Sequence, residues 1–249
     1  MKMNKISLPF KKAPFPSIMA VISLVLFIAV YLFSIMTSIE PYYFASLIFA
    51  VPFICFGIIT FLTVTEKLTV VLSSTITGIS IVVLGFAMLY ALVFMSVKLA
   101  TTVTTDIGKY ERVLKLTHYP NNPLTKYFPG EIPSNTKNIV FSYNPAFLQG
   151  GENFDLKFET DSDSIKKYID EFSHKVKWIG KSSDIEAKKN GVFSAAFNML
   201  GYTDQLPEDF TIYLIDSKPY HPNDWNHGEL SLAAISKQRN EIIFLAEDW

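Results

Sequence analysis

The chain has 249 residues and a net charge of −1; only 18% of its residues are charged, whereas 49% are hydrophobic. Residues 1–99 carry six basic and two acidic residues, a net of +4, and residues 100–249 carry sixteen basic and twenty-one acidic residues, a net of −5. Because phosphate binding needs a basic surface, the acidic second half argues against nucleic acid as a partner. The single cysteine, Cys55, excludes both an intrachain disulfide and a cluster of thiolate metal ligands.

Three long apolar runs occupy the first hundred residues, over 17–39, 41–64 and 69–97, and none of them contains Asp, Glu, Lys, Arg or His. Each exceeds the roughly 20 residues with which a helix crosses about 30 Å of hydrocarbon. The first run is also too long for the apolar region of a signal peptide. The sequence therefore predicts three transmembrane helices within 17–98, preceded by a basic segment, 1–16.

Basic residues at the ends of these runs indicate the orientation. Four lysines precede the first run, namely Lys2, Lys5, Lys11 and Lys12, so we expect a cytoplasmic N-terminus. Three spans then predict a multi-pass protein of the plasma membrane whose C-terminal domain is extracytoplasmic. Because transporters generally need ionisable groups inside the membrane, these helices are predicted to be an anchor whose partner is the lipid bilayer.

Two details concern helix packing within this anchor. Pro52 is expected to kink the second helix, because proline lacks the backbone donor and clashes with the preceding turn. Ser74, Gly78 and Gly85 form a stripe of small residues that would allow close helix contact in the third span. We expect this stripe to pack inside the anchor; the alternative is a dimer face.

Residues 99–133 are predicted to connect the anchor to a folded domain. A short helix over 101–118 is indicated by apolar residues at helical spacing, and the segment 119–133 contains four prolines and no periodicity. Proline fixes the backbone and removes donors, so this segment is expected to be extended and to lie on the domain.

Residues 134–249 predict an α+β domain with the order β-β-α-(α)-β-β-β, an antiparallel sheet covered by a helix on one face. Alternating apolar residues indicate a hairpin over 139–143 and 154–158, and an amphipathic helix capped by Thr160 and Asp161 follows. Residues 177–209 show no clear pattern beyond one possible short helix. Further strands are expected over 210–216, 229–236 and 241–248.

The segment 220–230, YHPNDWNHGEL, is the richest in functional side chains. His221, Asp224 and His227 form a weak metal candidate, because their spacing matches no established zinc pattern. We expect instead a structural turn at Asn226-His227-Gly228, since asparagine and glycine supply turn geometry. No metal and no cofactor is expected. The candidate ligand-binding residues come from this segment, from the FLQGG hairpin and from the C-terminal strand: Gln149, Gly150, Gly151, Trp225, Asn226, His227 and Glu247.

Several motifs resemble a family of uncharacterised membrane-attached or exported proteins of Gram-positive bacteria. They are F-P-x-x-I-P at 128–133, F-L-Q-G-G at 147–151, N-H-G at 226–228 and N-E-I-I-x-x-A-E-x-W at 240–249. The resemblance covers most of 127–249 and implies an exported domain, but it carries no assigned activity.

These patterns favour a membrane-anchored extracytoplasmic binding or interaction domain of unknown ligand. Its partner could be another membrane or cell-surface protein. The alternative is a cell-surface hydrolase or metal-dependent enzyme that uses the 221–227 loop. An enzyme would require the acidic and histidine side chains of 221–247 to converge in one cleft.

Overall fold

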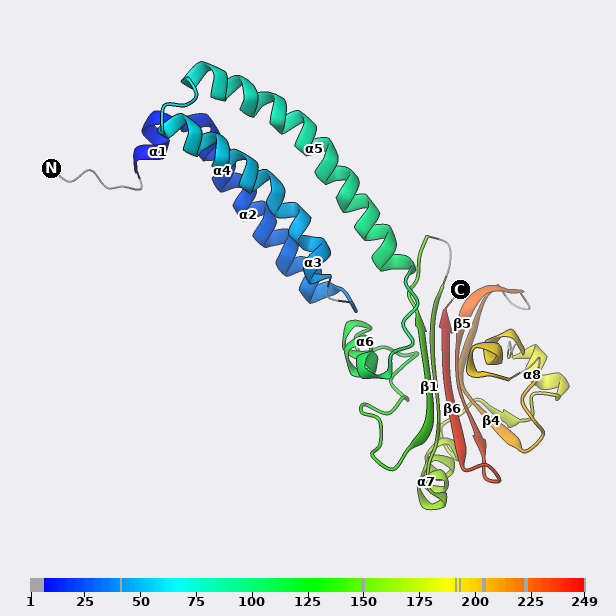
Figure 1. Cartoon of the computed structure of the whole chain (residues 1–249). Helices are drawn as coiled ribbons and strands as arrows, with labels where there is room; N and C mark the ends of the chain where they lie inside the picture. Colours follow the sequence, from blue (N-terminus) through cyan, green and yellow to red (C-terminus); the bar gives the residue numbers. More distant parts are fainter. Residues whose placement is uncertain are drawn as a thin grey trace. The chain divides into compact units, whose positions relative to one another are not determined.

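A computed structural model of the chain describes residues 7–40, 42–148, 151–190, 192, 194–202, 205–221 and 224–248 (Figure 1). The chain divides into two compact units, Met1–Leu99 and Ala100–Trp249. The first unit is helical. The second unit is built around an antiparallel sheet.

The first unit contains three helical segments that are long and apolar enough to cross a membrane: Pro14–Thr37, Tyr43–Val64 and Val70–Thr101. This confirms the prediction of three candidate transmembrane helices. The second segment is divided into α3 (Tyr43–Ser46), the 3-10 helix η1 (Leu47–Ala50) and α4 (Val51–Val64). The break precedes Pro52 because proline cannot donate to the preceding turn, so the expected irregularity is present. The other helices are α1 (Ser7–Lys12), α2 (Pro14–Thr37) and α5 (Val70–Thr101).

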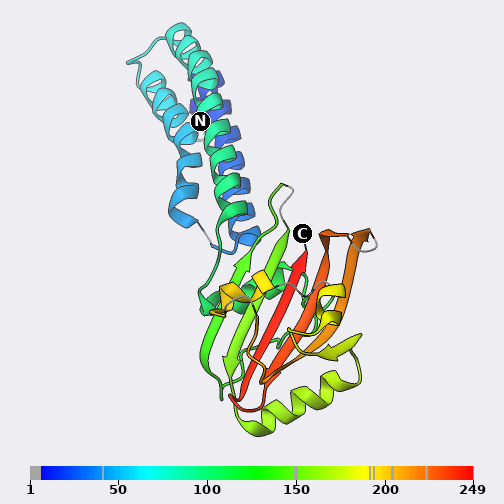
Figure 2. The same cartoon turned by 90° about the vertical axis from the view of Figure 1, so that its right-hand side faces the viewer.

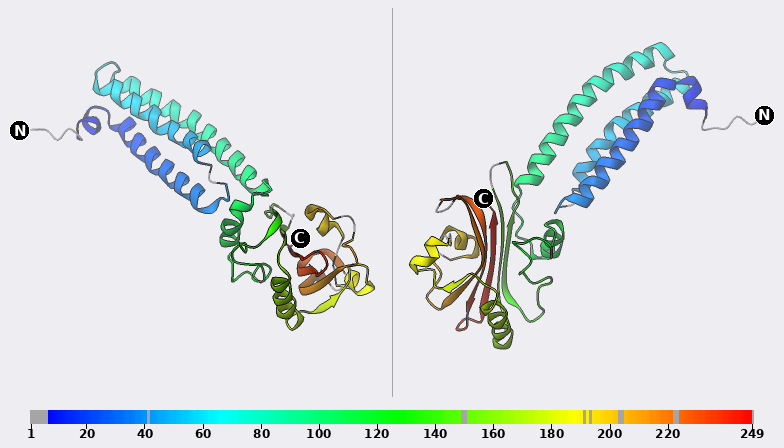
Figure 3. Two further views of the ribbon diagram at one scale, coloured as in Figure 1. Left: turned by 60° about the horizontal axis from the view of Figure 1, so that its bottom comes forward. Right: turned by 180° about the vertical axis from the view of Figure 1, so that it is seen from behind.

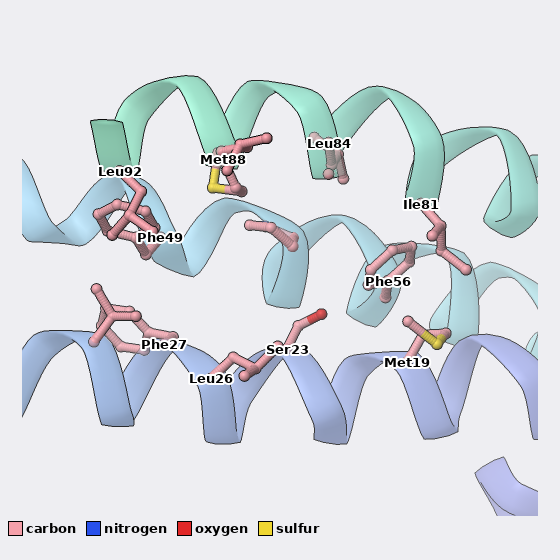
Figure 4. A pocket seen from close by; sticks show the side chains of 14 residues that line it. Met19, Ser23, Leu26, Phe27, Phe49, Phe56, Ile81, Leu84, Met88 and Leu92 are labelled. Carbon is pink, nitrogen blue, oxygen red and sulfur yellow. The ribbon is translucent and has the colours of Figure 1, made fainter. Parts of the chain in front are cut away.

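Helices α2 and α4 pack against each other through Ala20, Phe56 and Ile59, which are all buried. Between these helices and α5 lies an apolar pocket of about 390 Å³, into which Ile81 and other side chains of α5 project (Figure 4). No atom outside α5 and within the described residues comes within 4 Å of a Cβ built on Gly78 or Gly85. The expected close packing of the small-residue stripe inside the anchor is therefore wrong for these two glycines.

The second unit contains a six-stranded antiparallel sheet of order β1-β2-β6-β5-β4-β3. Its strands are β1 (Lys137–Asn144), β2 (Glu152–Glu159), β3 (Trp178–Gly180), β4 (Phe210–His221), β5 (Asp224–Ser236) and β6 (Glu241–Asp248). The prediction of an antiparallel sheet is confirmed. The sequence analysis missed β3, because three residues are too short to show an alternating pattern.

One face of this sheet is covered by aromatic side chains from α6 (Tyr110–Leu116), the segment 117–133 and α7 (Ser162–Ser173). Phe244 of β6 lies at its centre, with ring centroids 5.3 Å from Phe128 and 6.1 Å from Phe172. Tyr110 is also buried here, and its hydroxyl donates a hydrogen bond to the Pro129 carbonyl at 2.6 Å. The proline-rich segment thus lies on the domain as expected and contributes to its core. The expectation that it is extended is wrong, because much of 119–128 forms hydrogen-bonded turns. Helix α6 follows the short 3-10 helix η2 (Ile107–Lys109).

The opposite face of the sheet is covered by α8 (Ile185–Lys189) and the 3-10 helix η3 (Ser194–Leu200). Phe197 and Leu200 of η3 pack with Leu214, Leu232 and Leu245 in one buried cluster. Figure 1 and the right-hand view of Figure 3 show α6 on one side of the sheet and α8 on the other. The predicted single covered face is therefore corrected to two, because the region that showed no sequence pattern supplies the second layer.

Helix α7 is capped by Asp161 as the sequence predicts, but not by Thr160, whose buried hydroxyl has no hydrogen-bond partner among the described residues. The Asp161 carboxylate accepts hydrogen bonds from the backbone nitrogens of Asp163 at 3.0 Å and Ser164 at 2.8 Å. Such a cap satisfies donors that the first helical turn leaves unpaired, and a carboxylate also favours the positive end of the helix dipole.

Candidate functional site

Both loops that carry the sequence candidates lie at the same end of the sheet. β1 ends at Asn144 and β2 begins at Glu152, while β4 ends at His221 and β5 begins at Asp224. β6 ends at Asp248 between these two hairpins, as Figure 2 shows. The chain also enters this unit here, because Thr104 pairs with Tyr143 of β1 through two backbone hydrogen bonds of 2.8 Å.

The structure describes only some of the candidate ligand-binding residues that the sequence suggested. Gly151 immediately precedes β2, whereas Gln149 and Gly150 lie outside the described residues. Trp225, Asn226 and His227 belong to β5, but their side chains lie outside the part of the chain that is described. Glu247 belongs to β6 and is half-buried.

Of the three candidate metal ligands in the 220–230 segment, the structure describes only the side chain of His221. His221 ends β4 with an exposed side chain and pairs along the ladder with Asp224. The side chains of Asp224 and His227 are outside the described part. Among the described side chains, no three His, Cys, Asp or Glu residues form a group that could hold a metal ion. A metal at His221, Asp224 and His227 therefore stays a hypothesis of the sequence analysis.

The predicted turn at Asn226-His227-Gly228 is wrong, because these residues continue β5. Gly228 lies opposite Pro219, next to an irregularity of the ladder between Pro219 and His221. A Cβ atom at Gly228 would be only 2.5 Å from the carbonyl oxygen of Lys218. Glycine is therefore needed here for the close approach of two backbones and not for a turn.

Three carboxylates from three neighbouring strands line a pocket at this end of the sheet. Glu152 of β2 lies directly opposite Asp248 of β6, which in turn lies directly opposite Glu229 of β5. The pocket has a volume of about 400 Å³. The segment that follows α6 forms its other wall, and the full lining is Thr117, His118, Asn121, Asn122, Pro123, Leu124, Glu152, Glu229 and Asp248. We call it the acidic pocket.

The wall opposite the carboxylates is held by its own hydrogen bonds. The Asn122 side chain donates to the Thr117 carbonyl at 2.9 Å and accepts from the Leu124 backbone nitrogen at 2.9 Å. Ser231 of β5 is fully buried, and its hydroxyl donates to the Leu124 carbonyl at 2.8 Å. This segment is thus held by hydrogen bonds within itself and by one hydrogen bond to β5, which favours a pre-formed cavity.

Burial and mutual repulsion act on the carboxyl groups of the acidic pocket. Burial raises the pKa of Glu152, and the neighbouring Asp248 raises it further. Burial also raises the pKa of Asp248, and Glu229 adds to this effect. Glu229 forms an ion pair of 2.9 Å with Lys218, whose side chain is 58% exposed. One solvated lysine therefore faces three carboxylates, and the pocket retains excess negative charge.

Two more carboxylates lie on the opposite face of the sheet at the same end. Asp155 of β2 is only 2% exposed, and its Oδ1 atom has no hydrogen-bond partner among the described residues. Burial raises the pKa of Asp155 well above its usual range, and Glu247 raises it further. Burial likewise raises the pKa of Glu247 to about 7. Of these five carboxylates, the sequence analysis had singled out Glu247 alone.

No protein-family model, no curated protein and no solved structure matches this chain.

Proposed function

We propose that the chain is a membrane-anchored extracytoplasmic binding domain whose acidic pocket receives a cationic organic ligand. The observation that carries this proposal is the convergence of Glu152, Glu229 and Asp248, from three neighbouring strands, on one pocket. Like charges directly opposite each other destabilise a sheet. A bound cation would relieve this repulsion, because it favours the ionised form of each carboxyl group.

The dimensions and lining of the pocket favour an amine or guanidinium group over a bare metal ion. Its volume of about 400 Å³ falls within the range of about 300–1,000 Å³ that is typical of small-molecule sites. The three carboxylates of the acidic pocket do not form a group that could hold one metal ion. Pro123 and Leu124 supply apolar contact for the carbon atoms of such a ligand, while Asn121 and His118 add polar groups.

The distribution of lysines supports the proposed orientation. At one end of the helical unit, Lys12 of α1 forms a 2.6 Å ion pair with Glu66, so Lys11, Lys12 and the α4–α5 loop share that end. At the other end, Lys98 is the basic residue near the α2–α3 connection, with its ammonium 5.4 Å from the ring centroid of Tyr42. Basic residues are enriched on the cytoplasmic side of a membrane. The N-terminus would thus be cytoplasmic and the sheet domain extracytoplasmic.

The proposal is tested by isothermal titration of the full chain in detergent with cadaverine, a linear diamine, and with pentanediol as its uncharged counterpart. We expect cadaverine to bind and pentanediol not to bind. The double variant Glu152→Gln/Asp248→Asn should weaken cadaverine binding at least tenfold, about 1.4 kcal/mol. The matched control is Asp170→Asn, which removes an exposed carboxylate of α7. Equal binding of the two compounds, or equal affinity of the double variant and the wild type, would exclude the acidic pocket as the site.

A further inference from the structure

The pair formed by Asp155 and Glu247 lies outside the acidic pocket, on the other face of the sheet. Along a strand, side chains alternate between the two faces, so Asp155 and Glu152 point to opposite sides. Asp155 pairs with Leu245, and Leu245 belongs to the core under η3. Glu247 is two residues beyond Leu245 and shares its face. Asp155 and Glu247 are therefore diagonal neighbours across β2 and β6, with about 7–8 Å between such positions.

Neutral oxygen-bearing side chains surround this pair in the ladder. Ser142 of β1 lies opposite Asp155 and is buried, with 3% of its surface exposed. Asn153 lies opposite Glu247 and also opposite Asn144 of β1. All five positions belong to two adjacent rows at one corner of this face. The corner thus combines two carboxylates with one hydroxyl and two amides.

The nearest cation on this face of β2 is engaged elsewhere. The ammonium group of Lys157 donates a hydrogen bond to the Leu200 carbonyl and lies 4.8 Å from the centroid of the Tyr202 ring. It fastens η3 to the sheet. Burying a carboxylate without a partner is costly, and Asp155 Oδ1 has none among the described residues. Among the described residues, no cation therefore balances the charge of the Asp155 carboxylate.

We propose that Asp155 and Glu247 bind a hard divalent cation, with oxygen atoms of Ser142, Asn144 and Asn153 available to complete its coordination. Calcium takes six to eight oxygen ligands from carboxylates, amides, backbone carbonyls and water. Soft transition metals prefer thiolate or imidazole, and none of these five residues supplies either group. Because Asp155 is only 2% exposed, an organic substrate cannot contact its carboxylate from solvent. This site is independent of the proposed function in the acidic pocket.

The competing occupant is a proton. A protonated Asp155 would also remove the buried charge, since burial favours the neutral form of a carboxyl group. The two cases differ in their response to a chelator. A bound cation stabilises the folded chain by an amount that grows with the logarithm of the free cation concentration, whereas stabilisation by a proton does not depend on the cation concentration.

The test is a thermal melt of the full chain in detergent at about pH 8, first with EDTA and then with increasing Ca²⁺ or Mg²⁺ in excess. We expect at least one of the two ions to raise the melting temperature of the sheet domain by several degrees. Asp155→Asn should abolish this rise, and Glu247→Gln should abolish or strongly reduce it. Glu152→Gln/Asp248→Asn should retain it, because those residues lie on the other face.

A second measurement covers the case in which Asp155→Asn does not fold. Mn²⁺ binding to the full chain, followed by electron paramagnetic resonance, should show one tightly bound ion, which Glu247→Gln should release at least tenfold more readily. No rise in the melting temperature with either ion and no bound Mn²⁺ would overturn the proposal in favour of a protonated pair. A rise that is lost only in Glu152→Gln/Asp248→Asn would also overturn it, because the ion would then occupy the acidic pocket.

Discussion

Glu152 and Asp248 lie directly opposite each other in the β2–β6 ladder, and the Asp248 carboxylate raises the pKa of Glu152. An opposed pair of like charges weakens a sheet by a few tenths to about 1 kcal/mol. We therefore expect Glu152→Gln to raise the free energy of unfolding of the ligand-free chain by about that amount. The same substitution should weaken cadaverine binding. Denaturant unfolding of the full chain, with Asp170→Asn as control, measures the first effect.

A substitution that increases stability but weakens ligand binding distinguishes a binding pocket from a cluster that serves only the fold. Residues kept for a ligand often reduce the stability of the free protein. If Glu152→Gln destabilised the ligand-free chain instead, the carboxylate would be serving the fold, and the functional assignment of the pocket would lose its support.

The position of Gly228 opposite Pro219 leads to a second prediction. Gly228→Ala places a methyl group in steric conflict with the Lys218 carbonyl oxygen, because the built Cβ is only 2.5 Å from that atom. The strands must separate locally, so we expect a loss of about 1–3 kcal/mol in the free energy of unfolding. His221→Ala, at an exposed position of the same hairpin, should cost under about 0.5 kcal/mol. Equal costs for the two variants, measured by denaturant unfolding, would show that the backbones are not in close contact.

The buried carboxyl group of Glu247 predicts how stability depends on pH. Burial raises its pKa from an ordinary value of 4.5 to about 7, so the folded chain binds the proton more tightly than the unfolded chain does. The stability that this protonation contributes is complete below about 4.5 and is lost as the pH rises through about 7. With a chelator present, we expect the free energy of unfolding to fall by up to about 3 kcal/mol across this window.

Glu247→Gln isolates that contribution. The variant should lose most of this fall, although Asp155 titrates in the same direction because burial raises its pKa as well. A divalent cation should also reduce the pH dependence of the free energy of unfolding of the wild type, since it favours the ionised carboxylates. Unfolding experiments over a series of pH values, with and without Ca²⁺ or Mg²⁺, measure both effects. A wild-type profile that rises through this window would show that Glu247 is not buried.

Several features of the fold could be predicted from the sequence because their signals are local. The three apolar runs exceed the length of a membrane crossing, and this depends on no other part of the chain. Helix α7 combines an apolar stripe with a capping Asp161, and both signals lie within a few residues of each other. Strands β1 and β2 alternate strongly enough to be located, and β6 is located as a short continuous apolar run.

The acidic pocket could not be predicted, because it depends on pairing between distant segments. Glu152, Glu229 and Asp248 become neighbours only through the register of β2, β6 and β5. Asp155 was missed for a related reason. Alternation assigns Phe154 and Phe158 to a buried face and Asp155 to the other, which was expected to face solvent. Helix α8 and the 3-10 helix η3 cover that face, and their sequences show no periodic pattern.

The proposed orientation predicts which loops are accessible outside the cell. In a Cys55→Ser background, Asp170→Cys on α7 should react with a membrane-impermeant maleimide in intact cells. Lys67→Cys, exposed in the α4–α5 loop, should react only after lysis. Labelling of the two positions can be followed by gel shift. The reverse pattern would place the sheet domain in the cytoplasm.

The pH dependence of cadaverine binding to the full chain tests the central claim most directly. Because the pKa values of Glu152 and Asp248 are raised, cadaverine should bind most tightly above them and release protons as it binds near them. We predict that its affinity falls as the pH is lowered, beginning above the ordinary range of carboxyl groups, and that Glu152→Gln/Asp248→Asn removes this dependence. An affinity that is constant from about pH 8 to about pH 5, or that increases on acidification, would contradict the assignment of the acidic pocket as a cation-binding site.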